Sequence, residues 1–193
     1  MVADAKHALR KQARVRRPQL ARAAGAEAGV AAASHFLKAI TLLPGAVVSG
    51  YWPVGDEFDV RPLLERLHAA GHACALPVVV GKGKPLVFRR WEPGDTLVPA
   101  ALGIPVPLPE ADELVPDVLL VPMLAFDGEG YRLGYGGGFY DLTLASLREA
   151  APATLGVGAA YSGQRVAAVP HEATDERLDW ILTEQEIVRV GGR

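Results

Sequence analysis

The segment of this sequence with the clearest chemical character is a glycine-rich loop near residue 135. It lies between Pro122 and Asp141 and contains Gly134, Gly136, Gly137 and Gly138. Glycine adopts positive φ angles without a steric penalty and lets backbone N–H groups approach a phosphate closely. A helix is expected over residues 139–150, and its N-terminus would add further N–H groups and a partial positive charge. The loop is therefore predicted to bind an anion such as a phosphate.

The loop matches neither of the two common phosphate-binding motifs. No Lys-Ser or Lys-Thr pair follows the glycines, so it is not a P-loop, and Phe139 stands where a dinucleotide fingerprint requires its last glycine. A glycine-rich turn needed only for tight packing is the alternative. Three adjacent glycines, however, cost conformational entropy that packing seldom requires.

The N-terminal segment carries a second candidate for anion binding. Residues 1–22 contain seven lysines and arginines against one acidic residue, although the formal net charge of the whole chain is only −2. Lys6, Leu9 and Arg10 stand at i, i+3 and i+4 and so share one helix face. Leu9 would anchor this helix while Lys6 and Arg10 reach a phosphate, and Lys11 points elsewhere. A basic helix face that is merely solvated is the competing interpretation.

The predicted secondary structure alternates helices and strands around these segments. Residues 4–17 are rich in good helix formers, Arg14 and Arg17 extend the basic stripe, and Pro18 is expected to end or restart this helix. The other predicted helices are 19–40, 60–70 and 139–150. The predicted strands are 46–52, 72–77, 86–91, 117–121, 154–159 and one or two within 180–190, and the proline-rich stretch 92–116 is expected to be irregular.

This alternation predicts the α/β class, with a mostly parallel twisted sheet and helices on both faces. Residues 117–121 are apolar throughout, as is typical of a strand buried on both faces. Ligands of such folds bind at the carboxyl ends of the strands. The loops that begin at Pro53 and Pro122 are therefore the expected location of the chemistry.

Composition and chain length indicate what kind of protein this is. The chain has 193 residues, of which 50% are hydrophobic, and its one cysteine, Cys74, excludes a disulfide framework. We expect a single domain over 1–193, located in the cytoplasm and monomeric rather than oligomeric. No apolar run is long enough to span a bilayer, and neither a membrane nor a nucleic-acid partner is expected.

Residues 121–141 resemble the signature of the 5-formyltetrahydrofolate cyclo-ligase family, whose members are also called 5,10-methenyltetrahydrofolate synthetases. The resemblance covers nearly the whole chain and depends on segments that occur in the same order and at similar spacing. Besides the signature these are Lys6 with Leu9 and Arg10, 55–59, 88–91, 103–105, 169–172 with Asp175, and 183–184. Two positions depart from the pattern, since Tyr135 and Leu142 stand where many members carry arginine.

The resemblance implies a reaction and a fold. ATP and 5-formyltetrahydrofolate would give 5,10-methenyltetrahydrofolate, ADP and phosphate, with Mg²⁺, through an iminium phosphate intermediate. The implied fold is a three-layer arrangement like that of ribose-5-phosphate isomerase and CoA transferase proteins. The implied metal ligands are Asp141 and Asp175, and the implied catalytic residues are Arg132 and Tyr140.

The resemblance also implies the binding residues of both substrates. Those for ATP are Lys6, Arg10, Arg132, Leu133, Gly134, Tyr135, Gly136, Gly137, Gly138, Phe139 and Tyr140. Those for the folate are Trp52, Glu57, Tyr135, Gly136, Gly137, Gly138 and Phe139. These residue types suit their roles, because arginine and lysine bind phosphate, carboxylates bind Mg²⁺ and aromatic rings stack on a pterin.

Structural interpretations of the same residues remain open at this point. Glu57 and Asp175 would be solvated loop acids, Asp141 would only complement a helix N-terminus, and Trp52 would be part of the core. His68 and His72 are not expected to bind a metal, because Gly71 interrupts their helix and no third ligand is evident. Two other functions compete with the ligase: a phosphotransferase or isomerase acting on a sugar phosphate, and a folate- or nucleotide-binding module without turnover.

Overall fold

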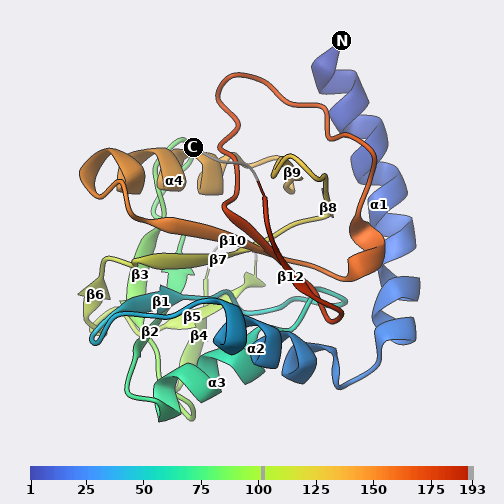
Figure 1. Ribbon diagram of the computed structural model, residues 1–193. Coiled ribbons are helices and arrows are strands. Elements are labelled where there is room, and N and C mark those ends of the chain that lie inside the picture. Colours follow the sequence, from blue (N-terminus) through green and yellow to red (C-terminus); the bar gives the residue numbers. More distant parts are fainter. Residues whose placement is uncertain (101–102, 191–193) are drawn as a thin grey trace.

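The computed structural model describes residues 1–100 and 103–190 of the chain and is built around one large sheet (Figure 1). Its strands are β1 (Val47–Ser49), β2 (Ala73–Val78), β3 (Val87–Arg90), β6 (Glu113–Leu114), β7 (Val118–Pro122), β10 (Leu155–Ala159), β11 (Trp180–Leu182) and β12 (Ile187–Arg189). They lie in the order β12-β11-β10-β7-β1-β2-β3-β6. The five strands from β11 to β2 run parallel, whereas β12, β3 and β6 pair antiparallel. The predicted α/β class with a mostly parallel sheet is confirmed.

The helices lie on both faces of the sheet, as expected. They are α1 (Val2–Ala24), α2 (Ala28–Ala39), α3 (Arg61–Ala69) and α4 (Phe139–Ala150). Helices α2 and α3 cover one face and α4 covers the other (Figure 1). Helix α1 packs against the short 3₁₀ helix Ser162–Gln164, which follows the carboxyl end of β10. The N-terminal helix therefore lies at the edge of the sheet where ligands of parallel folds bind.

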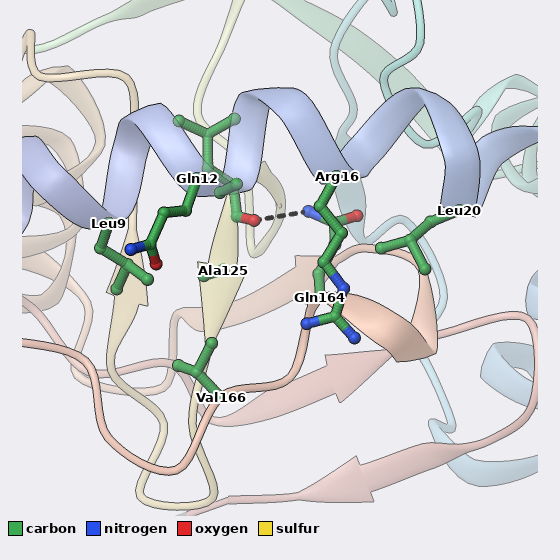
Figure 2. Close-up of a pocket in the computed structure, with 9 residues that line it drawn as sticks. Leu9, Gln12, Arg16, Leu20, Ala125, Gln164 and Val166 are labelled. Atoms are coloured by element: carbon green, nitrogen blue, oxygen red, sulfur yellow. Dashed lines mark hydrogen bonds between the residues drawn. The ribbon is translucent and has the colours of Figure 1, made fainter.

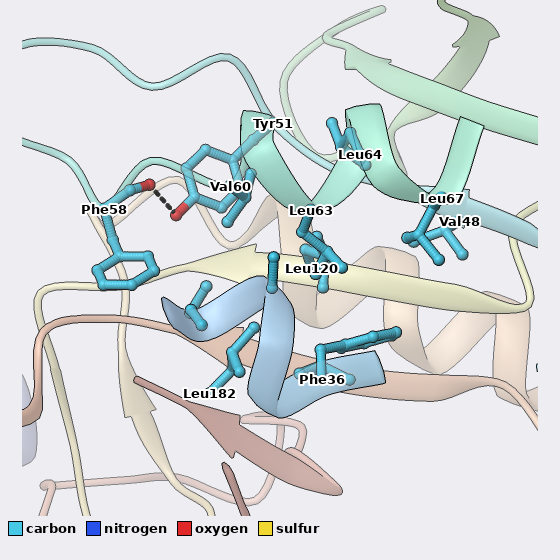
Figure 3. Packing of buried hydrophobic residues seen from close by; sticks show 14 of the residues in the cluster. Phe36, Val48, Tyr51, Phe58, Val60, Leu63, Leu64, Leu67, Leu120 and Leu182 are labelled. Atoms are coloured by element: carbon cyan, nitrogen blue, oxygen red, sulfur yellow. Dashed lines mark hydrogen bonds between the residues drawn. The ribbon is translucent and has the colours of Figure 1, made fainter. Parts of the chain in front are cut away.

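The core forms where α2 and α3 meet the central strands. Leu120 of β7 packs in one cluster with Phe36 of α2 and with Leu64 of α3, all of them fully buried (Figure 3). The four residues from Val118 to Val121 are buried, because helices cover both faces of β7. Burial of apolar side chains on this scale is the main favourable term in folding. It fixes the strand ends from which the functional loops begin.

The prediction that Pro18 would end the first helix is wrong. Helix α1 continues through Pro18 to Ala24, and Gly25, with a φ of 75°, follows its last residue. A proline inside a helix costs about 3 kcal/mol, but α1 is held on both sides of it. Arg17 is buried before the proline, and Leu20 packs against the main core after it. The second helix is correspondingly shorter than the predicted 19–40.

The proline-rich stretch 92–116 is also more regular than predicted. It contains β4 (Leu97–Pro99), β5 (Pro105–Pro107) and β6, although residues 101–102 lie outside the described part. Strands β4 and β5 pair only with each other, and β6 ends the large sheet. Proline is tolerated at such positions because one side of the strand needs no backbone hydrogen bonds. The prolines therefore limited these strands in length without abolishing them.

The long loop before α4 contains a hairpin that the sequence pattern did not indicate. It is formed by β8 (Ala125–Phe126) and β9 (Arg132–Leu133). Asp127 is buried in its turn and accepts hydrogen bonds from the N–H groups of Glu129, Tyr131 and Val169. The glycine loop thus begins directly after β9. No helix among the described residues is both long and apolar enough to cross a bilayer.

Candidate functional site

One large cavity of about 860 Å³ opens at the carboxyl ends of the strands. Its walls come from α1, from the loops that follow β1 and β2, from the glycine loop with the start of α4, and from the loop before β11. All fifteen residues selected from the sequence line it: Lys6, Arg10, Trp52, Glu57, Arg132, Leu133, Gly134, Tyr135, Gly136, Gly137, Gly138, Phe139, Tyr140, Asp141 and Asp175. These residues come from four chain segments that are distant in sequence and meet at one place.

The glycine loop turns sharply from β9 into α4. Gly136 has a φ of 105° and Gly138, at the N-cap of α4, has a φ of 69°. Residues other than glycine rarely adopt these φ angles. At Gly137 the obstacle is space, because an added Cβ would lie 2.7 Å from the ring of Phe139. The glycines are thus required by the backbone path, which leaves the N-terminus of α4 open to the cavity.

Helix α1 brings two cations to this loop. Arg10 donates a hydrogen bond from Nε to the carbonyl oxygen of Gly134 at 2.9 Å, and its guanidinium lies about 3.6 Å from the position of a Cβ on Gly136. Lys6 pairs with Asp175 at 2.5 Å and with Glu172 at 3.5 Å. Leu9 packs behind them in a separate small cluster, as an anchor should. Lys11 is exposed and lies outside the cavity lining.

The two carboxylates selected as metal ligands each have a cation as neighbour. Oδ1 of Asp141 accepts from Nη2 of Arg132 at 2.6 Å and from the N–H of Glu176 at 3.0 Å. Oδ2 of Asp175 accepts from Lys6 and from the N–H of Glu172. Burial by itself would raise the pKa of Asp175, but the hydrogen bonds from Lys6 and from the N–H of Glu172, together with the charges of Lys6 and Arg132, outweigh it and the pKa is lowered. Asp175 is therefore ionised at neutral pH, the form that can bind a cation.

This pair of carboxylates fits a magnesium ion carried by a nucleotide, but not a metal centre built from protein ligands alone. Within the described residues there is no cluster of three histidine, cysteine or acidic side chains. Among the residues that the structure describes, hydrogen bonds engage one oxygen of Asp141 and one of Asp175, so the other oxygen of each can ligate a metal. Mg²⁺ on ATP needs only one or two carboxylates besides phosphate oxygens and water.

The part of the cavity away from Lys6 and Asp175 is lined by an aromatic ring and a single carboxylate, those of Trp52 and Glu57. Trp52, half-buried, stands edge-on to Trp91 at 6.3 Å and below the guanidinium of Arg61 at 5.2 Å, so part of its ring is available to a ligand. Glu57 accepts the N–H of Val54 at 2.9 Å through Oε2. Its carboxylate is therefore oriented by its own loop. A planar heterocycle with N–H donors suits this arrangement.

Two tyrosines line the cavity between the two ends. Tyr140 is half-buried, and the loss of water around its hydroxyl together with the charge of Glu57 raises the pKa of that hydroxyl. Tyr51 donates its hydroxyl proton to the carbonyl of Phe58 at 2.7 Å (Figure 3), and its pKa is raised, again mainly by burial. Both hydroxyls are neutral at physiological pH. They are therefore suited to donate hydrogen bonds and not to act as anions.

Sequence analysis underestimated Arg17 among the residues of this cavity. Its guanidinium lies in the cavity wall, donates to the Tyr135 hydroxyl, and pairs with Asp56 at 2.8 Å. The basic stripe on the first helix did include Arg17, but nothing in the pattern distinguished it from its exposed neighbours Arg14 and Arg16. Burial is what distinguishes it, since only 9% of Arg17 is exposed.

A second, smaller cavity lies on an adjacent face of α1 (Figure 2). Apolar side chains such as Leu9, Leu20 and Val166 form most of its wall, and its volume is about 130 Å³. The side chain of Gln164 beside it is already satisfied, because it donates to the carbonyls of Met123 and Leu124 and accepts from the N–H of Tyr161. This cavity is an imperfection in the packing of α1.

The whole chain was compared with known proteins. The model of the 5-formyltetrahydrofolate cyclo-ligase family matches residues 2–184. The 5-formyltetrahydrofolate cyclo-ligase of Escherichia coli K12 is 34% identical over 83% of this chain and 90% of its own length, and that of Mycolicibacterium smegmatis is 36% identical over 73% and 75%. The structure of 5,10-methenyltetrahydrofolate synthetase from Aquifex aeolicus superimposes with a TM-score of 0.74 at 30% identity and covers 97% of this chain and 94% of its own. Together with a cavity lined by all fifteen residues that the resemblance implicates, these matches show that the chain belongs to the 5-formyltetrahydrofolate cyclo-ligase family.

Proposed function

We propose that the cavity binds ATP and 5-formyltetrahydrofolate at its two ends and brings them together so that a phosphoryl group passes from ATP to the folate. The activity itself, that of a 5-formyltetrahydrofolate cyclo-ligase, follows from membership of the family. The observation that supports the residue roles is that the fifteen residues implicated by the family resemblance meet around one cavity. Lys6, Arg10 and the glycine loop form the end for the triphosphate. Trp52 and Glu57 form the end for the pterin.

The chemistry explains why such a site needs little acid or base catalysis. The carbon of a formamide is a poor electrophile and its oxygen a poor leaving group. Transfer of the γ-phosphoryl group of ATP to that oxygen gives an iminium phosphate and ADP. The N10 amine then attacks the same carbon, loses its proton and expels inorganic phosphate, which carries the formyl oxygen away. The protein must mainly align the two substrates and neutralise phosphate charge.

The positions of the charged residues fit this requirement. Arg132 is proposed to stabilise charge on the transferred phosphoryl group, and its ion pair with Asp141 holds the guanidinium in place. Tyr140 is proposed to donate a hydrogen bond near the reacting atoms, since burial keeps its hydroxyl protonated. Asp141 and Asp175 would hold Mg²⁺, which neutralises phosphate charge when bound. We also propose that the chain acts as a monomeric single domain in the cytoplasm, because the described site is complete within one chain and ATP is supplied there.

The activity is tested by mixing the protein with Mg·ATP and 5-formyltetrahydrofolate. We expect the absorbance of 5,10-methenyltetrahydrofolate to rise together with the release of one phosphate per turnover. Binding of both ligands without product would instead favour a binding module. Failure to bind either ligand would favour another substrate, such as a sugar phosphate.

The role of the basic helix face is tested with three alanine variants. Lys6→Ala and Arg10→Ala are each expected to raise the KM for ATP about tenfold, because each removes one charge-assisted hydrogen bond to phosphate. Lys11→Ala is the matched control, since Lys11 is exposed on another face of the same helix; its KM for ATP should change by less than about twofold. Steady-state kinetics measure all three. Equal effects of the three substitutions would show that the helix is merely solvated.

The pterin end is tested with Glu57→Gln. Glutamine keeps an acceptor for the N–H of Val54 but removes the charge that pterin N–H donors would meet. The KM for 5-formyltetrahydrofolate should rise about tenfold while the KM for ATP stays within about twofold. Glu65→Gln, an exposed acid on α3, serves as control. An equal rise in both KM values would indicate a role in folding or closure and contradict the assignment.

The metal ligands are tested with Asp141→Asn. Asparagine keeps an oxygen that can accept from Arg132 and from the N–H of Glu176, so thermal stability should change little. The Mg²⁺ concentration needed for half-maximal turnover should rise about tenfold or more, because the metal loses an anionic ligand. Glu149→Gln, on an exposed part of the same helix, should leave it unchanged. Wild-type turnover at limiting Mg²⁺ would remove Asp141 from the metal site.

A further inference from the structure

A largely buried cluster of charges joins α1 to the glycine loop and to the loop after β1, which carries Trp52 and Glu57. At its centre is Arg17, which donates one nitrogen, Nη1, to the hydroxyl of Tyr135 in the glycine loop. The other nitrogen, Nη2, pairs with Asp56 in the loop after β1 at 2.8 Å. The guanidinium also lies 5.6 Å from the centre of the Tyr135 ring. One side chain thus connects three segments that are far apart in the sequence.

The cluster is expensive to bury and incompletely satisfied. Nε of Arg17 and Oδ2 of Asp56 are buried and have no hydrogen-bond partner among the described residues. Burial by itself would lower the pKa of Arg17, but the hydrogen bond to Asp56 and the neighbouring charges raise it, and the same bond lowers the pKa of Asp56. Both groups are therefore charged. Buried ion pairs of this kind contribute little net stability, since apolar residues of similar size often serve as well. A role other than stability has to explain the cluster.

Glu57 is the residue on which the cluster acts. Its Oε1 lies 3.9 Å from Nη1 of Arg17, and only 13% of its side chain is exposed. The same nitrogen, Nη1, donates to the hydroxyl of Tyr135, so that bond and the pair with Asp56 fix the guanidinium beside Glu57. The Glu57 carboxylate is thereby held from two sides, by the guanidinium of Arg17 and by the N–H of Val54.

We propose that Arg17 is a positioning residue for folate binding. Held by Tyr135 and Asp56, its guanidinium keeps the carboxylate of Glu57 in the orientation that the pterin N–H donors need. This inference rests on the proposed pterin-binding role of Glu57. It requires arginine and not merely a positive charge, because two nitrogens of one planar group serve Tyr135 and Asp56 at once, which a lysine ammonium cannot reproduce at the same distances.

The test is direct titration of 5-formyltetrahydrofolate into the protein without ATP, and of ATP without folate, by calorimetry. Arg17→Lys keeps the charge and should weaken folate binding about tenfold while ATP affinity stays within about twofold. Tyr135→Phe removes only the hydroxyl that holds Arg17 beside Glu57, and it should weaken folate binding similarly. The double variant should bind the folate about as tightly as whichever single variant binds it less tightly, because both substitutions break the same Arg17–Tyr135 contact. Arg14→Lys, one turn away and exposed, should match the wild type.

The possible outcomes separate this inference from the proposed function. A wild-type protein that does not bind the folate would contradict the proposed function itself. Wild-type binding combined with unchanged folate affinity of Arg17→Lys and Tyr135→Phe would overturn the role of Arg17 alone. So would an equal loss of folate and ATP affinity, or a folate affinity that falls only in proportion to the folded fraction measured by circular dichroism. Additive losses in the double variant would show that Arg17 does not act through Tyr135.

Discussion

The site depends on the way one face of α1 is held against the carboxyl ends of the strands by pairs of opposite charge. Lys6 pairs with Asp175, Arg10 bonds the backbone of the glycine loop, and Arg17 pairs with Asp56. The first and last of these are eleven residues, close to three helical turns, apart, so they face the same side over about 16 Å. A rigid helix thus sets the distance between the end proposed for the nucleotide and the end proposed for the folate. This distance must be fixed for a phosphoryl group to move from one substrate to the other.

The same pairing keeps the cavity from being a region of unbalanced charge. Lys6 pairs with Asp175 and Arg132 with Asp141, and both cations are largely buried. On the proposed function, a triphosphate with Mg²⁺ would bring anions to the cations and a cation to the carboxylates, so each group would exchange one partner for another. A ligand with charge of one sign only would leave a largely buried charge without a partner, which is costly. Selectivity for a ligand that carries both signs of charge follows from this arrangement.

The glycine loop and the family signature were enough to identify the cavity lining, because chemistry constrains those positions directly. Gly136 and Gly138 need positive φ angles and Gly137 needs the absence of a side chain, which only glycine provides. The course of the chain around Pro18 was not predictable in the same way. Its helix persists because of contacts with residues far away in sequence, and local propensity carries no information about them. The role of Arg17 was not predicted for the same reason, since the sequence does not show whether an arginine is buried or exposed to solvent.

Near Tyr135, a positive charge is supplied by another part of the chain than the glycine loop itself. Sequence alone indicated a loss of positive charge there, because many family members carry arginine at this position. In the structure a positive charge is nevertheless present, since the guanidinium of Arg17 lies over the Tyr135 ring and bonds its hydroxyl. The charge reaches the glycine loop from α1, a different element of the fold. Leu142, the other departure, is exposed and outside the cavity lining, so it takes no charge away from the site. Electrostatic function is thus a property of where side chains meet in space, and a single aligned position records only part of it.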